Sequence, residues 1–236
     1  MTVLAQRIRR YVELSGRMEG AAWLARARAA IDSGQDLSAA DLAAAIALLL
    51  PLTPPDFALR CGREERLSDL GTVGHAIASS RTLEQALSIW SAHSGDIDPL
   101  MHFRIHVRGE SWRTEFTAST DLSPAVRRFL AEEWLSNFFT FLKEVTALVD
   151  PAARIELRHP PAFGLAYELW LPVRPEFRRA ANRLTLSRSL LATPLRSRND
   201  EMLDLILRHF RDRPAAPAPW SEQVRRTLTS HAADTP

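Results

Sequence analysis

The sequence predicts an α+β domain in which an antiparallel sheet packs against one long helix, with a helical region at the N-terminus. Three observations support this fold class. Residues 101–108 and 111–117 alternate apolar and polar side chains, as half-buried strands do. Residues 123–148 carry apolar side chains around much of a helix, which is typical of a helix buried on a sheet. Residues 2–50 are rich in Ala, Leu, Arg and Glu at helical spacing.

The composition is that of an ordinary globular protein. Of the 236 residues, 46% are hydrophobic and 25% are charged, and the formal net charge is +2. No apolar run approaches the roughly 20 residues that a membrane span needs, and residues 1–16 lack the apolar stretch of a signal peptide. Cys61 is the single cysteine, so an intrachain disulfide is excluded. We therefore expect a cytoplasmic protein without membrane contact.

The N-terminal region is predicted to contain two helices. Residues 2–31 have no Pro and place apolar side chains at helical spacing, and Gly16 and Gly20 can divide this stretch. Ser38 has the position of a helix cap for residues 41–50, and Pro51 ends that helix.

Residues 67–90 predict a helix, a tight turn and a second helix. Leu83, Leu87 and Trp90 lie on one apolar face of the second helix, and Thr82 with Gln85 has the spacing of a capping box. A helix-turn-helix suggests DNA recognition, which requires side chains that read base edges and phosphates. The second helix offers Glu and Ser instead, so a helical corner of the core is the favoured interpretation.

The rest of the chain is predicted to complete the sheet and to end in helices. Gly109-Glu110 is a turn between the strands 101–108 and 111–117. Further short strands are expected at 154–158, 167–173 and 183–186, and a helix at 199–211. Residues 213–219 form a Pro/Ala linker, which separates a domain at 1–212 from the start of a new helix at 220–236.

Catalytic and metal-binding motifs are absent from the sequence. His102 and His106 share a strand face but stand about 13 Å apart, whereas zinc ligands lie about 2 Å from the metal. We therefore expect no metal, no cofactor and no enzymatic activity. For a ligand pocket between sheet and helices, the sequence indicates a set of aromatic and polar side chains: Trp90, His102, Arg104, His106, Trp112 and Tyr167.

The long helix also predicts a dimer contact. Phe138 and Phe139 are adjacent, about 100° apart on a helix, and Phe141 widens the apolar arc further. One sheet face covers about half of a helix, so the excess needs cover from the N-terminal helices or from a second chain. We expect a homodimer through these three residues, or through the helix 199–211 beside them.

Two segments resemble the N-terminal effector domain of one branch of AraC-type transcriptional regulators, which carries an arabinose-binding-like label. The segment LGTVGHAIASSRTLEQAL is similar to the branch's pattern LGxxGxAxxSSxTLxxAL. The segment RHPPAFGLAYELWLPVRPEFRRAANRLTLSRSLLATPL is similar to its second signature, although Leu186 stands where the family usually has Phe, and Arg174 and Trp170-Leu171 also depart from it. The resemblance covers about residues 37–230.

The resemblance implies a regulatory domain that binds a small-molecule effector of unknown identity and pairs with a copy of itself. In the family, DNA is bound through a C-terminal helix-turn-helix domain, which is absent from this chain. The alternative is a stand-alone protein-interaction module without a small-molecule ligand.

Overall fold

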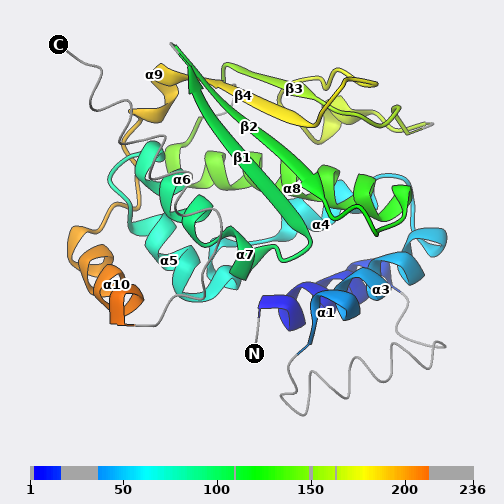
Figure 1. The fold of residues 1–236 in the computed structure, drawn as a ribbon, viewed down its shortest axis with the longest axis horizontal. Helices are drawn as coiled ribbons and strands as arrows, with labels where there is room; N and C mark the ends of the chain where they lie inside the picture. Colours follow the sequence, from blue (N-terminus) through cyan, green and yellow to red (C-terminus); the bar gives the residue numbers. More distant parts are fainter. Residues whose placement is uncertain (1–2, 17–36, 109, 149–150, 163, 213–236) are drawn as a thin grey trace.

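The computed structural model describes residues 3–16, 37–108, 110–148, 151–162 and 164–212. It confirms the α+β class, with a twisted sheet on one side, the long helix α8 (Pro124–Thr146) beneath it, and the other helices below and around α8 (Figure 1). The predicted linker at 213–219 and the helix at 220–236 lie outside the described residues. In the described part, no helix is long and apolar enough to span a membrane.

Four antiparallel strands form the sheet in the order β1-β2-β4-β3. The predicted hairpin is confirmed, and its register pairs Met101 with Ala118 and Arg108 with Ser111. The strands have these bounds: β1 (Met101–Arg108), β2 (Ser111–Ala118), β3 (Ala153–Glu156) and β4 (Arg183–Ser187). Because strand side chains alternate between faces, Phe103 of β1 and Phe116 of β2 point to the core, whereas Arg104 of β1 and Arg113 of β2 point outward.

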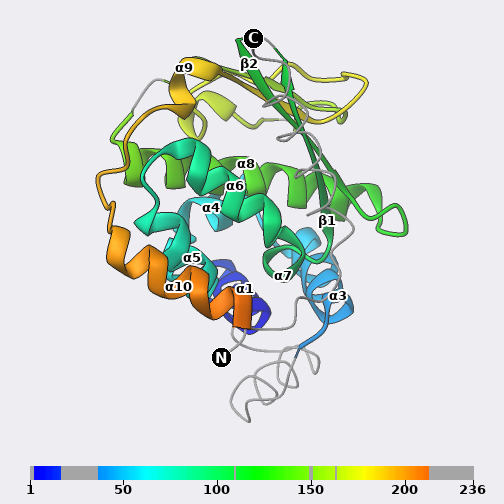
Figure 2. The ribbon, with the colours of Figure 1, turned by 60° about the vertical axis from the view of Figure 1, so that its left-hand side comes forward.

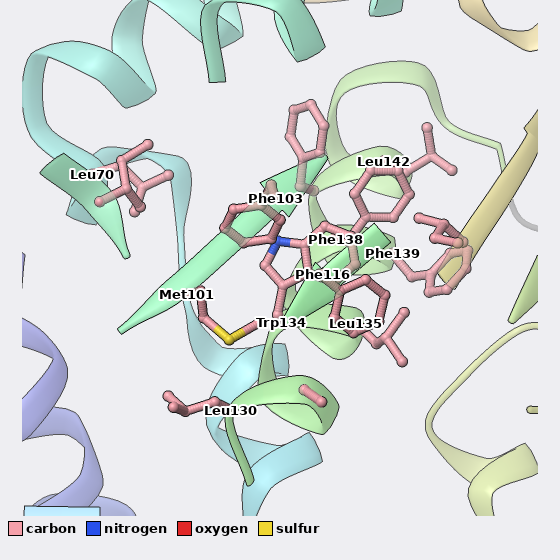
Figure 3. Close-up of a cluster of buried hydrophobic side chains, with 14 of the residues drawn as sticks. Leu70, Met101, Phe103, Phe116, Leu130, Trp134, Leu135, Phe138, Phe139 and Leu142 are labelled. Carbon is pink, nitrogen blue, oxygen red and sulfur yellow. The ribbon is translucent and has the colours of Figure 1, made fainter. Parts of the chain in front are cut away.

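Helix α8 begins where its sequence predicts and ends two residues before the predicted end at Leu148. The Ser123 hydroxyl accepts a hydrogen bond from the Val126 N–H, and Pro124 occupies the first helical position. Ala147 ends the helix in the left-handed conformation. One side of α8 faces the sheet, where Trp134 packs among Phe103, Phe116 and Phe138 (Figure 3).

The other side of α8 is covered by the N-terminal helices. These are α1 (Val3–Ser15), α3 (Ala39–Leu49), the short 3-10 helix η1 (Leu50–Leu52) and α4 (Phe57–Glu64). Ser38 and Asp41 form a capping box at the start of α3. Gly62 lets α4 approach α8 closely, because a Cβ there would lie 2.1 Å from the backbone oxygen of Glu133.

The helical corner predicted at 67–90 is present as η2 (Leu67–Leu70), α5 (Gly71–Ser79) and α6 (Leu83–Ala92). The Thr82 hydroxyl caps α6 by accepting from the Gln85 N–H, but the Gln85 side chain bonds the N–H of Arg81, not that of Thr82. Gly74 is required by packing, since a Cβ there would lie 1.7 Å from the Leu67 oxygen. A short helix, α7 (Ser94–Ile97), follows α6 in the stretch before β1.

The C-terminal part of the chain returns to this corner. The expected strand at 167–173 is wrong: the structure has the 3-10 helix η3 (Tyr167–Leu169), because the Tyr167 side chain turns inward to α8 and leaves no partner strand. Helix α9 (Arg188–Leu191) follows β4, and α10 (Asp200–Asp212) packs beside α5 (Figure 2).

The start of α6 is covered by residues that follow α9. The Leu83 N–H donates to the Thr193 carbonyl (3.0 Å), and the Leu195 N–H donates to the Arg81 carbonyl (3.1 Å). In a DNA-binding helix-turn-helix the N-terminal residues of the second helix contact base edges. Here that end of α6 is covered, which supports the interpretation of 67–90 as a corner of the core.

Candidate functional site

Two adjacent carboxylates in the middle of α8 organise the polar part of the core. The side chains of Glu132 and Glu133 are each 1% exposed. Because consecutive helical residues point about 100° apart, Glu132 faces the segment that carries Tyr167, whereas Glu133 faces α1. A buried carboxylate is costly unless it is paired and hydrogen-bonded, so each should have dedicated partners.

Glu132 is hydrogen-bonded by two side chains and lies near a third, and we call Arg128, Glu132, His159 and Tyr167 the Glu132 group. Its Oε1 accepts hydrogen bonds from the Tyr167 hydroxyl (2.6 Å) and from Arg128 Nε (3.0 Å). His159 Nε2 lies 3.8 Å from the same oxygen. The Tyr167 oxygen in turn accepts from the Ala162 N–H (3.2 Å). Burial raises the pKa of Tyr167, so the phenol stays protonated and donates at neutral pH.

The tautomer of His159 follows from its backbone contact. Nδ1 lies 2.8 Å from the Pro160 carbonyl oxygen, which can only accept, so Nδ1 carries the hydrogen. Burial lowers the pKa of His159 and favours the neutral ring. In that form Nε2 is an acceptor, and it is buried without a hydrogen-bond partner among the described residues.

A cavity of about 500 Å³ opens beside this group, and we call it the Glu132 cavity. Its walls come from the connector between α3 and α4, from the first half of α8 and from one residue near Tyr167. The lining is mostly apolar, with three polar side chains: Leu50, Thr53, Pro54, Pro55, Phe57, Ala58, Ala125, Arg128, Phe129, Glu132 and Ala162.

Glu133 belongs to a second buried polar cluster that fixes α1 to the core. Its Oε2 accepts from Arg7 (2.7 Å), and its other oxygen accepts from the Tyr11 hydroxyl. Arg7 also pairs with Asp98 at the end of α7. Glu65 lies 3.9 Å from Arg7 Nε and pairs with Arg10 at 3.2 Å. These contacts extend the cluster to the end of α4.

Aromatic rings connect the Glu133 cluster to the Glu132 cavity. The Tyr11 ring packs edge-on against Phe129, with centroids 5.3 Å apart, and against Phe57 at 6.5 Å. Phe57 and Phe129 line the Glu132 cavity. A molecule that displaces these rings would therefore press on Tyr11 and on the cluster that holds α1.

A larger hollow of about 610 Å³ lies at the other end of α8, near its C-terminal half. Arg63 lies over the Trp170 ring there, 5.6 Å from the ring centroid. Exposed charges of both signs surround this hollow, including Glu64 and Lys143. It lacks a buried polar group comparable to Glu132.

The structure does not bring the six predicted pocket residues together. His102, Arg104 and His106 lie on the exposed outer face of β1 and line neither hollow. Trp112 is buried in the core, and Trp90 packs against Phe103 and Trp134. Of the six, Tyr167 alone reaches the Glu132 group.

The residues that form the Glu132 cavity were not predicted from the sequence. The available signal was a pair of carboxylates, Glu132 and Glu133, in the middle of an aromatic-rich helix. Arg128 precedes Glu132 by one helical turn, the spacing of an ion pair along a helix. The cavity's other wall is about 75 residues earlier in the chain, and no local pattern links the two. Among the described residues, no group of side chains could hold a metal ion.

The three phenylalanines predicted at a dimer contact are covered by their own chain. Phe138, Phe139 and Phe141 are 5%, 6% and 9% exposed. The sheet covers one side of α8 and the N-terminal helices cover the other, so no aromatic excess is left for a second chain at these positions. This removes the reason for placing a dimer contact there.

Comparison with known proteins gives the family. The family model described as the arabinose-binding domain of AraC transcription regulators, N-terminal, matches residues 18–195. The structure is similar to the crystal structure of the transcriptional regulator CdpR from Pseudomonas aeruginosa, with a TM-score of 0.58 and 17% identity over 80% of this chain. The match spans 62% of that regulator's chain. No protein of curated function matches. The chain therefore belongs to the N-terminal arabinose-binding domain family of AraC transcription regulators.

Proposed function

We propose that this chain senses a small-molecule effector and forms a homodimer as the regulatory part of an AraC-type transcription regulator. Its family membership supports a regulatory, effector-binding domain rather than an enzyme. DNA binding in such a regulator belongs to a separate C-terminal domain, and a regulator that acts on bacterial DNA works in the cytoplasm.

The Glu132 cavity is the observation that carries effector sensing. Its volume of about 500 Å³ lies within the roughly 300–1,000 Å³ of small-molecule sites, and its lining of apolar side chains with a few polar groups is typical of them. The cavity also touches Tyr11 through Phe57 and Phe129, so occupation of the cavity can alter the contacts of α1.

A thermal-shift screen of small metabolites tests effector sensing. A ligand that binds the native state alone raises stability by RT ln(1 + [L]/Kd), so an effector should raise the melting temperature as its concentration rises. Ala125 is exposed and lines the cavity, so Ala125→Trp should block the site and abolish the shift.

Ala40→Trp is the matched control, because Ala40 is an exposed alanine of α3 outside the cavity lining. Binding that survives Ala125→Trp would place the effector elsewhere. A screen in which no compound shifts the melting temperature would favour a protein-interaction module without a ligand.

Helix α10 supports the dimer part of the proposal. Met202 and Leu205 are 44% and 57% exposed on the side of α10 that does not contact α5. The exposed residue Glu201 lies near the start of the helix and the exposed residue Arg208 near its end. Two such helices packed antiparallel about a two-fold axis near Leu205 place Glu201 of each chain near Arg208 of the other.

A further inference from the structure

The lining of the Glu132 cavity includes a guanidinium, that of Arg128, whose orientation is already fixed. Arg128 Nε donates to Glu132 Oε1 at 3.0 Å, one helical turn along α8. Glu132 is itself held by the Tyr167 hydroxyl at 2.6 Å. A side chain that is held in place loses little rotamer freedom when a ligand binds, which favours affinity.

Arg128 retains donors that Glu132 does not use. A guanidinium has five N–H donors, of which the Nε–H is the one bonded to Glu132. The Arg128 side chain is 31% exposed and lines the cavity. Among the described residues, Glu132 is the one carboxylate within ion-pair distance of Arg128. The guanidinium also has a hydrogen-bond interaction with the Tyr167 side chain. Its two terminal amino groups carry four N–H donors between them, so donors remain for a further acceptor such as a carboxylate.

Apart from Thr53, the rest of the cavity lining is apolar. The rings of Phe57 and Phe129 lie 5.8 Å apart and tilted by 42°, and Pro54 and Pro55 line the same space. Burying the apolar body of a ligand against this surface is favourable by about 25 cal/mol per Å² of apolar area removed from water. A ligand that matches this lining is apolar along most of its length and carries one polar group.

The polar head can be assigned from the charges present. An ammonium head would lie beside the like charge of Arg128 and compete with Arg128 and Tyr167 for the same carboxylate. An amide head would replace the water around Arg128 with a single neutral acceptor. A carboxylate offers two oxygens to the terminal amino groups, and charge-assisted pairs of this kind are about twice as strong as neutral hydrogen bonds. The like charge of Glu132 opposes it less, because Arg128 Nε and the Tyr167 hydroxyl already bond that carboxylate.

We propose that the Glu132 cavity binds a molecule with an apolar body and one carboxylate. The carboxylate pairs with the terminal amino groups of Arg128, and the apolar body packs on Phe57 and Phe129. This inference rests on the proposed effector-sensing function and names the chemical class of its ligand.

Matched probe series test this class. Phenylacetate, 4-phenylbutanoate and octanoate are each compared with the corresponding primary amide and amine by thermal shift and titration calorimetry on the full chain. At least one carboxylate should raise the melting temperature with concentration, while its amide and amine have a much smaller effect. If amides or amines bind better than the acids, the carboxylate assignment is wrong while effector sensing stands. If no carboxylate binds, the assignment is also overturned.

Variants of Arg128 separate recognition from folding. Arg128→Lys keeps the charge but loses the paired geometry, and should lower the affinity for the tightest-binding carboxylate about tenfold. The double variant Arg128→Gln/Glu132→Gln removes both charges and avoids a buried unpaired carboxylate, and should weaken binding about tenfold to a hundredfold. Circular dichroism checks that its fold is retained.

Arg63→Gln, at the other hollow, is the matched control and should bind as the wild type does. Unchanged carboxylate affinity in the folded double variant would overturn the role of Arg128. Loss of affinity in Arg63→Gln with retention in the double variant would move the site to the C-terminal half of α8.

Discussion

At the scale of single residues, the core of this domain depends on buried ionisable groups that have dedicated partners. Glu132 and Glu133 are neighbours in sequence, yet one holds the wall of a cavity and the other holds α1. Burial raises the pKa of Glu133, and Arg7 opposes that rise. Removing one partner of such a group leaves a buried charge uncompensated and is strongly destabilising.

Glu65 should make stability depend on pH. Burial raises its pKa from 4.5 to about 7, so the folded state binds a proton over a range in which the unfolded state has lost it. The free energy of unfolding therefore falls as pH rises from about 4.5 through 7, by roughly a few kcal/mol at most. Glu65→Gln removes this titration.

The measurement is the melting temperature of wild type and variant between pH 5 and pH 8. The melting temperature of Glu65→Gln minus that of the wild type should become more positive as pH rises. Glu64→Gln, at the exposed neighbouring residue, serves as the control and should show a constant difference. A constant difference for Glu65→Gln as well would contradict the prediction.

Gly62 should not tolerate a side chain. A Cβ at this position would lie 2.1 Å from the Glu133 oxygen and 2.8 Å from the Asn137 nitrogen, both backbone atoms of α8. The two helices would have to separate, so we expect Gly62→Ala to lower the free energy of unfolding by about 3 kcal/mol. Urea denaturation measures this loss.

Gly95→Ala is the comparison for Gly62→Ala, because no heavy atom lies within 4 Å of a Cβ built at Gly95. Its free energy of unfolding should stay within about 0.5 kcal/mol of the wild type. Equal stability of the two variants would show that α4 and α8 can separate at little cost.

At the scale of elements, α8 shows that the number of aromatic residues in a helix does not indicate whether its own chain or a second chain covers them. Its apolar arc is wide because it is buried between two layers, the sheet on one side and the N-terminal helices on the other (Figure 1). A dimer would need the same arc. Whether a second chain or the same chain covers α8 depends on where α1, α3 and α4 pack, which is a tertiary property.

Helix α10 gives the prediction for assembly. If α10 pairs antiparallel with its copy, Glu201→Arg and Arg208→Glu should each weaken the dimer by like-charge contacts across the two-fold axis, and the double variant should restore it. Leu205→Glu should also disrupt the dimer, because it places a charge at its centre.

Light scattering at micromolar concentration provides the measurement. The wild type and the double variant should give close to twice the chain mass of 26.5 kDa. Leu48→Glu is the control, because Leu48 is a leucine of α3 that is 45% exposed, and it should leave the mass unchanged. A wild-type mass of one chain, or no rescue in the double variant, would reject this arrangement.

At the scale of the whole molecule, the helical corner is part of the core rather than a DNA-reading surface. The start of α6 is hydrogen-bonded to residues 193–195, and the outer face of the sheet carries Arg104 and Arg113 without a helix to enter a groove. We therefore predict that this chain alone shows no sequence-specific DNA binding. Electrostatic attraction to phosphates should be weak and fall steeply with salt.

Gel mobility with candidate operator duplexes and a scrambled competitor checks this prediction. Any complex should be removed equally well by the specific and the scrambled duplex. Raising the salt concentration from 50 to 200 mM should abolish it. Nanomolar binding that resists the scrambled competitor would show that this domain reads sequence by itself.

The sequence by itself determined the elements whose signals are local. The alternation in 101–108 and 111–117 sets the hairpin. Ser123-Pro124 sets the start of α8, and Thr82 sets the start of α6, because each signal concerns neighbours along the chain. The family was also predicted, from two segments whose residues pack in the corner and around Tyr167.

The tertiary structure decided the site. Phe57, Arg128 and Ala162 meet at one cavity although they are far apart in sequence. Tyr167 was predicted as a strand residue, but its side chain turns inward and its hydroxyl donates a hydrogen bond to Glu132. A buried carboxylate without such a donor would be costly. His102, Arg104 and His106 were placed on the correct strand but face outward. A period of two gives the face that residues share, and only packing decides which face is buried.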